Sequence, residues 1–311
     1  MSESIAAKTR QNPILRMTLA TFVCVALVLS VAVTLTGSKA DAASIRIRVA
    51  TYNICAQYCP GLASFSTRSS QIVSAVEAYD PDVFFVQEAG RASYEVKTLR
   101  SKLRNYTMIK GSNARYIFMR KSTMTTYSVT GSKLSSGVTT VRATSRSKLQ
   151  YVPYHLLRRK NSRFYLLAVN LHLTALDGPG SDSAREAEMK QIWSKMSTRE
   201  RAYPTVFGGD LNSLSRNPNN IVNCDSDIYR SRVSAFLRAR GYEDAVFKTT
   251  VGTSRSANTY NPSRSDTRNF CTYFQLDHLF TGNRVRIGNF IVVRHSSYSD
   301  HNMIVADLYR S

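Results

Sequence analysis

The sequence predicts a single α/β domain over residues 44–311, and three observations support it. Helical and strand patterns alternate along the chain, several strands are apolar throughout, and no Pro-rich or Gly-rich linker divides the region. An apolar run of strand length is typical of a strand buried on both faces. No internal repeat of solenoid length is present. We therefore expect one domain with a large core.

The strands are expected from apolar runs and from alternation of apolar and polar residues. The run 45–53 alternates at its start, 83–88 is nearly all apolar, and short runs with Ser, Thr and Gly turns fill 106–167. The expected strands are 45–53, 83–88, 115–119, 124–129, 138–143, 150–158, 164–172, 204–209, 272–280, 284–293 and 303–309.

Four helices are expected, at 66–79, 93–103, 182–199 and 228–240. Helical spacing of apolar residues and nearby capping residues indicate the first and third of these. Ser181 or Asp182 caps the third helix, and Gly241 ends the fourth.

Residues 1–43 form a separate segment, either a signal peptide or an N-terminal membrane anchor. Basic residues precede an uncharged apolar stretch from Met17 to Gly37, and small residues follow as far as Ala43. This order is typical of an export signal cleaved near Ala40 or Ala43. The apolar stretch of roughly 20 residues is also just long enough to span a bilayer. In either case we expect the domain to be secreted or held on the extracellular face.

The cysteines are consistent with export. Cys24 lies in the N-terminal segment, and four others remain, an even number suited to an oxidising compartment. Three pairings are open, of which we favour Cys55 with Cys59, because they bracket one short loop, and Cys224 with Cys271. A zinc site is the weaker alternative, because the spacing matches no standard ligand pattern.

The chain is strongly basic, with a formal net charge of +21. Residues 1–40 hold four bases and one acid, so the remainder has 38 bases and 20 acids, or +18. Such a charge favours a polyanionic partner: nucleic acid, anionic lipid headgroups or cell-wall phosphates. The alternative is that the protein is simply a basic secreted protein.

The run 206–213 (Val-Phe-Gly-Gly-Asp-Leu-Asn-Ser) indicates a buried strand that ends in a polar site. Side chains two residues apart share a face in a strand, so Asp210 and Asn212 would point the same way. Gly208 and Gly209 permit a close approach of backbone or ligand. Turn formation is the alternative, because Gly-Asp-x-Asn is also favourable turn sequence.

Similar polar residues end the other apolar strands. Each has a structural explanation by itself, but their repetition predicts a site assembled from many strand ends. These residues are Asn53, Glu88, His172, Asp210 with Asn212, and Asp277 with His278, to which Ser299-Asp300-His301 adds a group before the last strand. His155 and His295 lack such a setting, and we expect them to be structural or surface residues.

The motifs resemble those of the endonuclease/exonuclease/phosphatase superfamily, and in particular a secreted bacterial member with the deoxyribonuclease I-like fold. The resemblance covers residues 45–311 and implies a four-layer sandwich of two packed mixed β-sheets flanked by helices. Its motifs are Thr51-Tyr-Asn53, Gln87-Glu88, Asn170-Leu-His172-Leu, Gly208-Gly-Asp-Leu-Asn212, Leu276-Asp-His278 and Ser299-Asp-His301.

The resemblance also implies a metal site. Glu88 is similar to the principal Mg²⁺ ligand, Asn53 to a residue that helps hold metal and phosphate, and Asp300 to a second carboxylate near the metal. Oxygen ligands of this kind select a hard cation, Mg²⁺ or Mn²⁺, over zinc.

The remaining matched residues are expected to handle the water, the phosphate and the protons. Asp210 and Asn212 resemble the pair that orients the attacking water and binds the scissile phosphate. His301 is similar to the general base or phosphate ligand, with Asp277 orienting its ring. His172 resembles the general acid or phosphate contact of the deoxyribonuclease and sphingomyelinase branches.

The sequence departs from these branches in two places. The deoxyribonuclease branch pairs its general acid with a glutamate on the preceding strand, and the stretch 150–157 offers no acid. A long hydrophobic hairpin like that of the sphingomyelinases is not evident. Arg255, Arg264 and Arg268 lie in polar loops, where they contact phosphate or are merely solvated.

The function expected is a Mg²⁺-dependent, monomeric endonuclease that hydrolyses DNA with low sequence specificity. One alternative is a phosphodiesterase acting on choline or anionic phospholipids in the manner of sphingomyelinases, or a phosphatase of small phosphoesters. An alternative of another class is an inactive module that binds polyanions.

Overall fold

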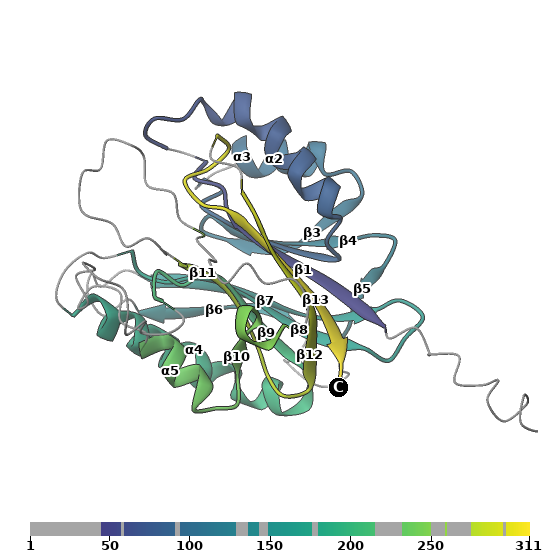
Figure 1. The fold of residues 1–311 in the computed structure, drawn as a ribbon, viewed down its shortest axis with the longest axis vertical. Coiled ribbons are helices and arrows are strands. Elements are labelled where there is room, and N and C mark those ends of the chain that lie inside the picture. The colour runs from purple at the N-terminus through teal and green to yellow at the C-terminus, as the bar shows by residue number, and fades with distance from the viewer. Residues whose placement is uncertain are drawn as a thin grey trace, which may run out of the picture. The chain divides into compact units, whose positions relative to one another are not determined.

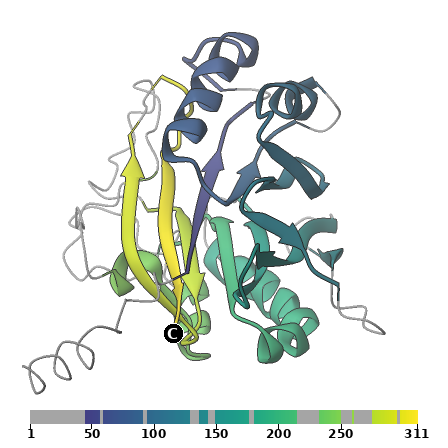
Figure 2. The same ribbon diagram turned by 90° about the vertical axis from the view of Figure 1, so that its right-hand side faces the viewer.

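Two mixed β-sheets pack face to face, and helices cover their outer faces (Figures 1 and 2). The computed structural model describes residues 45–56, 59–90, 94–128, 136–142, 149–175, 180–214, 232–249, 259, 275–294 and 297–311. They belong to one unit, 45–311, which is distinct from 1–44. The four-layer sandwich implied by the motifs is therefore confirmed.

The first sheet has six strands and carries α2 (Phe65–Tyr79) and α3 (Tyr94–Lys102) on its outer face. Its strand order is β12 (Val285–Val293), β13 (Met303–Arg310), β1 (Arg46–Asn53), β2 (Val83–Gln87), β4 (Arg115–Arg120) and β3 (Tyr106–Ser112).

The second sheet has seven strands and carries α4 (Ser181–Ala202) and α5 (Arg232–Arg238) on its outer face. Its main path is β10 (Glu243–Asp244), β11 (Asp277–Thr281), β9 (Thr205–Asp210), β8 (Tyr165–His172), β7 (Leu149–Arg159) and β5 (Met124–Thr126). β6 (Ser136–Arg142) pairs with β7, and the short helix α6 (Ala245–Lys248) follows β10.

The strands that are apolar throughout lie where both faces of the sheet are covered by other apolar residues. In β2, Val83 and Phe85 enter the core between the sheets, whereas Phe84 and Val86 pack under α2 and α3. The same alternation in β8 sends its odd-numbered residues Leu167 and Val169 toward α4. Burial of both faces explains why these runs lack the polar alternation of a half-exposed strand.

Two close contacts require the glycines of β9. A Cβ on Gly209, whose φ is +141°, would lie 1.9 Å from the carbonyl oxygen of Leu171 on the neighbouring strand. A Cβ on Gly208 would lie 2.6 Å from the ring of Phe85 across the core. The close approach expected at this pair therefore involves the protein's own backbone and core.

The structure differs from the expected elements mainly at edges. β3 was not expected as a separate strand, because its residues are half-exposed at a sheet edge and a register shift between Met108 and Lys110 breaks their alternation. β5 ends at Thr126 and β11 begins at Asp277, so both are shorter than predicted. The short elements β10 and α6 were also missed.

Several predictions concern residues outside those described. These are the N-terminal segment 1–43, Cys224, Cys271, His295 and the loop arginines Arg255, Arg264 and Arg268. Within the part of the chain that is described, no helix is long and apolar enough to cross a membrane.

Candidate active site

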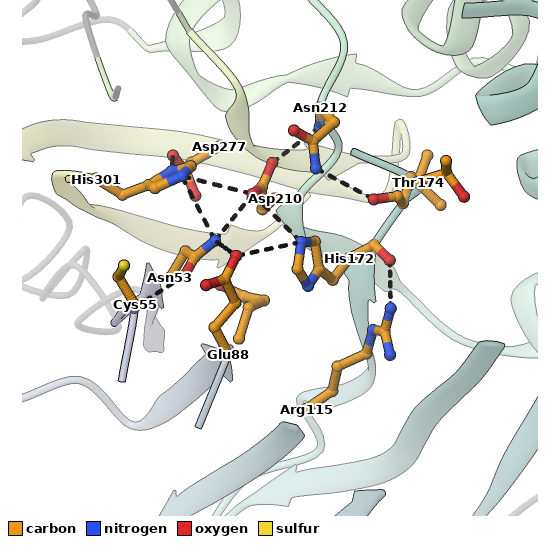
Figure 3. Close-up of polar contacts among 12 residues, drawn as sticks. Asn53, Cys55, Glu88, Arg115, His172, Thr174, Asp210, Asn212, Asp277 and His301 are labelled. Atoms are coloured by element: carbon orange, nitrogen blue, oxygen red, sulfur yellow. Dashed lines mark hydrogen bonds and ion pairs between the residues drawn. The ribbon is translucent and has the colours of Figure 1, made fainter. Parts of the chain in front are cut away.

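Two parallel strand pairs bring the polar strand ends together. β1 runs parallel to β2, and β8 runs parallel to β9, with His172 in register with Asp210. β11 is antiparallel to β9, so its first residue, Asp277, is opposite Asp210. The carboxyl ends of β1, β2, β8 and β9 therefore meet one end of β11 (Figure 3).

Asn53 lies at the centre of this group and is fully buried. Its amide nitrogen Nδ2 donates to Glu88 Oε1 at 2.9 Å and to Asp210 Oδ2 at 3.0 Å. Its oxygen Oδ1 accepts the backbone N–H of Cys55 at 3.1 Å, and that bond fixes which end of the amide faces the site. Asn53 thus presents a donor to the two carboxylates, whereas a metal ligand would have to present its oxygen.

Asp210 and Asn212 form a turn as well as part of the site. The backbone N–H of Asn212 donates to Asp210 Oδ1 at 2.9 Å, and Asn212 has a φ of +48°. The Asn212 amide nitrogen donates to the carbonyl oxygen of Leu173 at 3.1 Å. The turn expected for this motif is therefore present, and Asp210 Oδ2 accepts the bond from Asn53.

His301 lies between two carboxylates. Its Nδ1 is 2.8 Å from Asp277 Oδ2, and its Nε2 is 3.7 Å from Asp210 Oδ2. Burial opposes a charge on the ring, but Asp277 and Asp210 outweigh it and raise the pKa of His301 well above its usual value. Burial also raises the pKa of Asp210 to about 7, although the charge of His301 lowers it. The expected pairing of Asp277 with His301 is present.

His172 faces the same carboxylates from the other side. Its Nε2 lies 3.6 Å from Asp210 Oδ2 and 3.7 Å from Glu88 Oε1. Burial, followed by the positive charges of Arg115 and His301, lowers the pKa of His172 well below its usual value. The neutral ring can therefore accept a proton or a hydrogen bond.

Glu88 directly follows β2 in the left-handed region, with a φ of +56°. Its side chain is 40% exposed, so it faces solvent while Oε1 accepts the bond from Asn53. Ligand atoms of Glu88, His172 and Asp210 all lie within 4.8 Å of one another. The cluster could hold a small cation and keep one side open to a substrate.

The sequence profile of the Endonuclease/Exonuclease/phosphatase family matches residues 50–301. The chain belongs to this family. Members of the endonuclease/exonuclease/phosphatase family are metal-dependent phosphoester hydrolases, so the chain is an enzyme of that class. A comparison with curated proteins gave no match.

Solved structures share the fold at low sequence identity. An endonuclease/exonuclease/phosphatase family protein from Bacteroides thetaiotaomicron has 18% identity, with a TM-score of 0.66 over 86% of this chain and 99% of that one. A mannosyl-6-phosphatase from the same organism has 19% identity and a TM-score of 0.61, covering 84% and 99%. D. rerio TDP2 with a single-strand DNA product has 15% identity and a TM-score of 0.60, covering 85% and 98%.

Of the residues matched to the family, Asp300 has a different neighbourhood from Glu88. Its carboxylate lies within 4.8 Å of the sulfurs of Cys55 and Cys59, which form the predicted disulfide. It also accepts a bond from Ser299 Oγ at 3.3 Å. Asp300 still acts on the site electrostatically, because its charge contributes to the raised pKa of His301.

A buried network behind His172 was not predicted. Arg115, at the start of β4, donates to the carbonyl oxygen of His172 at 2.6 Å and to Gln150 Oε1. Gln150 Nε2 donates in turn to Thr174 Oγ1 at 2.9 Å, and Thr174 donates from its hydroxyl and backbone N–H to the buried Glu188. The stretch 150–157 thus contributes a neutral amide, that of Gln150, to this network.

The role of Arg68 was not predicted either, because this residue lies in the middle of a helix rather than at a strand end. Its guanidinium donates to the carbonyl oxygens of Ile54, Cys55, Ala63 and Tyr298. It thereby ties the loop after Asn53 to the segment that carries Asp300 and His301. The only sequence signal was a charged residue on the apolar face of the predicted helix.

Proposed function

We propose that the chain is an exported, Mg²⁺-dependent endonuclease that hydrolyses DNA with low sequence specificity. The convergence of Glu88, Asp210, His172 and His301 around the amide of Asn53 carries the proposal. This set gathers two carboxylates, which can hold a cation, and two imidazoles, which can bind phosphate or transfer protons, and metal-dependent hydrolysis of a phosphodiester uses groups of these kinds.

The donor set fits a hard divalent cation. Glu88 and Asp210 would hold it through carboxylate oxygens, with His172 beside them, and oxygen ligands favour Mg²⁺ or Mn²⁺. Such an ion supplies positive charge to a non-bridging phosphate oxygen. Asn53 would position both carboxylates through its amide nitrogen, and Asp300 would add negative charge near His301.

His301 and His172 would have separate roles in the reaction. Asp277 orients His301, whose Nε2 faces the open position, where it can contact the phosphate or exchange a proton with the attacking water. Asp210 lies between the two rings and would align that water, with the turn at Asn212 fixing its carboxylate. His172, on the other side of Asp210, has a neutral ring and would contact the phosphate through a hydrogen bond.

Charge favours nucleic acid as the substrate. A formal net charge of +21 attracts a polyphosphate backbone without regard to base sequence. The TDP2 structure, described with single-strand DNA product, supports the same choice at the level of the fold. The similar mannosyl-6-phosphatase makes a small phosphomonoester the second candidate.

Export is supported by the apolar segment 17–37 and by the Cys55–Cys59 disulfide, because disulfides persist in oxidising compartments. Fractionation of cells that express the full chain checks this part of the proposal. Recovery of all the protein from the cytoplasm, with both thiols free, would contradict it.

Nicking of supercoiled plasmid tests the activity. We expect the full chain to nick plasmid with Mg²⁺, to stop with EDTA, and to lose activity when Glu88→Gln or His301→Ala is introduced. Arg100→Gln, on the exposed face of α3, is the matched control and should nick normally. A folded protein that hydrolyses p-nitrophenyl phosphate but leaves plasmid intact would favour the small phosphoester instead.

A further inference from the structure

A cleft lies at the end of the sandwich opposite the active site. His172 and Asp210 end β8 and β9, whereas the cleft is lined by Tyr165 and Pro204, where these strands begin. The C-terminus, which marks this end of the molecule, is labelled in Figure 2. The cleft has a volume of about 420 Å³, within the range of sites that bind small ligands.

Arginines dominate the charge of this cleft. Arg163, Arg284 and Arg310 line it and all three are exposed, whereas the one carboxylate among its described lining residues is the chain end at Ser311. A second cleft of about 130 Å³ shares Arg284 with it and adds Arg240. The guanidinium of Arg240 is held over the ring of Phe236, 3.6 Å from its centroid. Guanidinium groups suit phosphate because their N–H groups form a planar fork.

Tyrosine rings border the same clefts. Tyr203 lines both clefts, and its ring centroid lies 5.7 Å from that of Tyr165. Tyr127 extends the row, 4.6 Å from Tyr165. All three side chains are only partly buried and pack against the core cluster that α4 covers, so part of each remains accessible. Accessible aromatic rings beside a basic groove are a means by which proteins hold unpaired bases.

We propose that these two clefts form a second nucleic-acid site, which binds a short stretch of single-stranded DNA or RNA. Arg163, Arg284 and Arg310 would bind its phosphates, and a base would stack on Tyr165 or Tyr203. A duplex does not fit this chemistry, because its bases are already stacked on one another. The site lies away from the hydrolytic residues, so it would tether a strand without cleaving it.

Binding in EDTA tests the site separately from hydrolysis. Fluorescence anisotropy of the full chain would compare a labelled 20-nucleotide oligothymidylate with an abasic phosphodiester of equal length, at 0.15 M salt. We expect the Arg284→Glu/Arg310→Glu variant to weaken binding of both chains about tenfold or more. It should also reduce the slope of log K against log salt by about two, since two phosphate contacts are lost.

Variants of Tyr165 test base stacking separately from the phosphate contacts. Tyr165→Leu should weaken binding of oligothymidylate about tenfold and leave binding of the abasic chain unchanged. Tyr165→Phe, which keeps the ring, should bind both as the wild type does. Thermal unfolding of each variant establishes that it is folded. Equal affinity of wild type for the two chains would overturn the proposal in favour of a general polyanion surface.

A matched charge control completes the test. Arg100→Glu/Arg104→Glu makes the same charge change at two exposed positions on and just after α3. Weakening equal to that of the cleft variant would show that net charge alone acts, which contradicts a built site. Hydrolysis of bis(p-nitrophenyl) phosphate with Mg²⁺ is measured in parallel. Its absence would overturn the proposed function and leave the binding result intact.

Discussion

The guanidinium of Arg115 donates a 2.6 Å hydrogen bond to the backbone carbonyl oxygen of His172. Arg115 is buried, and burial lowers its pKa to about 10, so it still carries its charge at neutral pH. The bond joins the start of β4 in one sheet to the end of β8 in the other. It holds the strand end that presents the His172 ring to Asp210.

Replacing this arginine should impair catalysis more than folding. We expect Arg115→Gln to lower kcat about tenfold to a hundredfold, because a small misplacement of a reacting group has effects of that order. KM should change little, because Arg115 does not face the substrate. Steady-state kinetics of plasmid nicking measure the separate changes in kcat and KM, and Arg100→Gln is the surface control. A change in KM alone would show that Arg115 serves binding.

Asp277 is expected to act through His301. Asp277→Asn keeps the size of the side chain but removes the charge that orients the ring and favours its protonated form. We expect kcat to fall about a hundredfold, within the range of positioned proton transfer. Circular dichroism and thermal unfolding verify the fold. Activity within twofold of wild type would show that the pair is structural only.

Gly209 should tolerate no side chain. A Cβ there would lie 1.9 Å from the carbonyl oxygen of Leu171, so Gly209→Ala is expected to cost about 3 kcal/mol or more in the free energy of unfolding. Gly180 is the matched control, since its φ of +85° is also positive but nothing lies within 4 Å of its added Cβ. Gly180→Ala should cost only about 1–2 kcal/mol. Urea denaturation compares them, and equal losses would contradict the steric argument.

His278 should make stability depend on pH. Its Nδ1 lies 2.7 Å from Asp244 Oδ2 and its Nε2 lies 2.7 Å from the carbonyl oxygen of Ser213. Only the protonated ring can donate to both. Burial opposes this charge, but Asp244 outweighs it and raises the pKa of His278 above its usual 6.5.

The direction of the pH dependence of stability follows from the raised pKa of His278. The stabilisation is fully present below about pH 6.5, the unfolded value, and is lost as the pH rises through the higher folded-state pKa. Asp244→Asn breaks a buried pair and should cost about 3–5 kcal/mol at pH 6 and less at pH 9. Urea denaturation across this range measures the difference between variant and wild type. A difference that does not change with pH would refute the assignment.

Local pattern accounts for what was predicted correctly. The central strands β2, β8 and β9 were found because burial on both faces leaves a continuous apolar run, and their polar ends Glu88, His172 and Asp210 interrupt that run. Edge elements such as β3 and β10 leave no comparable run. The Cys55–Cys59 pair was found because its short loop is itself a local feature.

Contacts between residues distant in sequence could not be predicted from local patterns. Arg115 lies 57 positions from His172, and nothing in either segment indicates the other. The amide of Asn53 faces the carboxylates with its nitrogen, because the backbone of Cys55 takes its oxygen. The placement of Asp300 beside the disulfide likewise depends on how two loops fold back on each other.

The sequence by itself determined the central strands, the order of their polar ends and hence the family, because side-chain periodicity and short motifs are properties of neighbouring residues. Only the tertiary structure decided the opposite pKa shifts of His172 and His301 and the tyrosine-lined basic clefts at the far end. Protonation depends on burial and on charges a few ångströms away, and a cleft depends on which strand ends meet. Those distances are set when the two sheets pack.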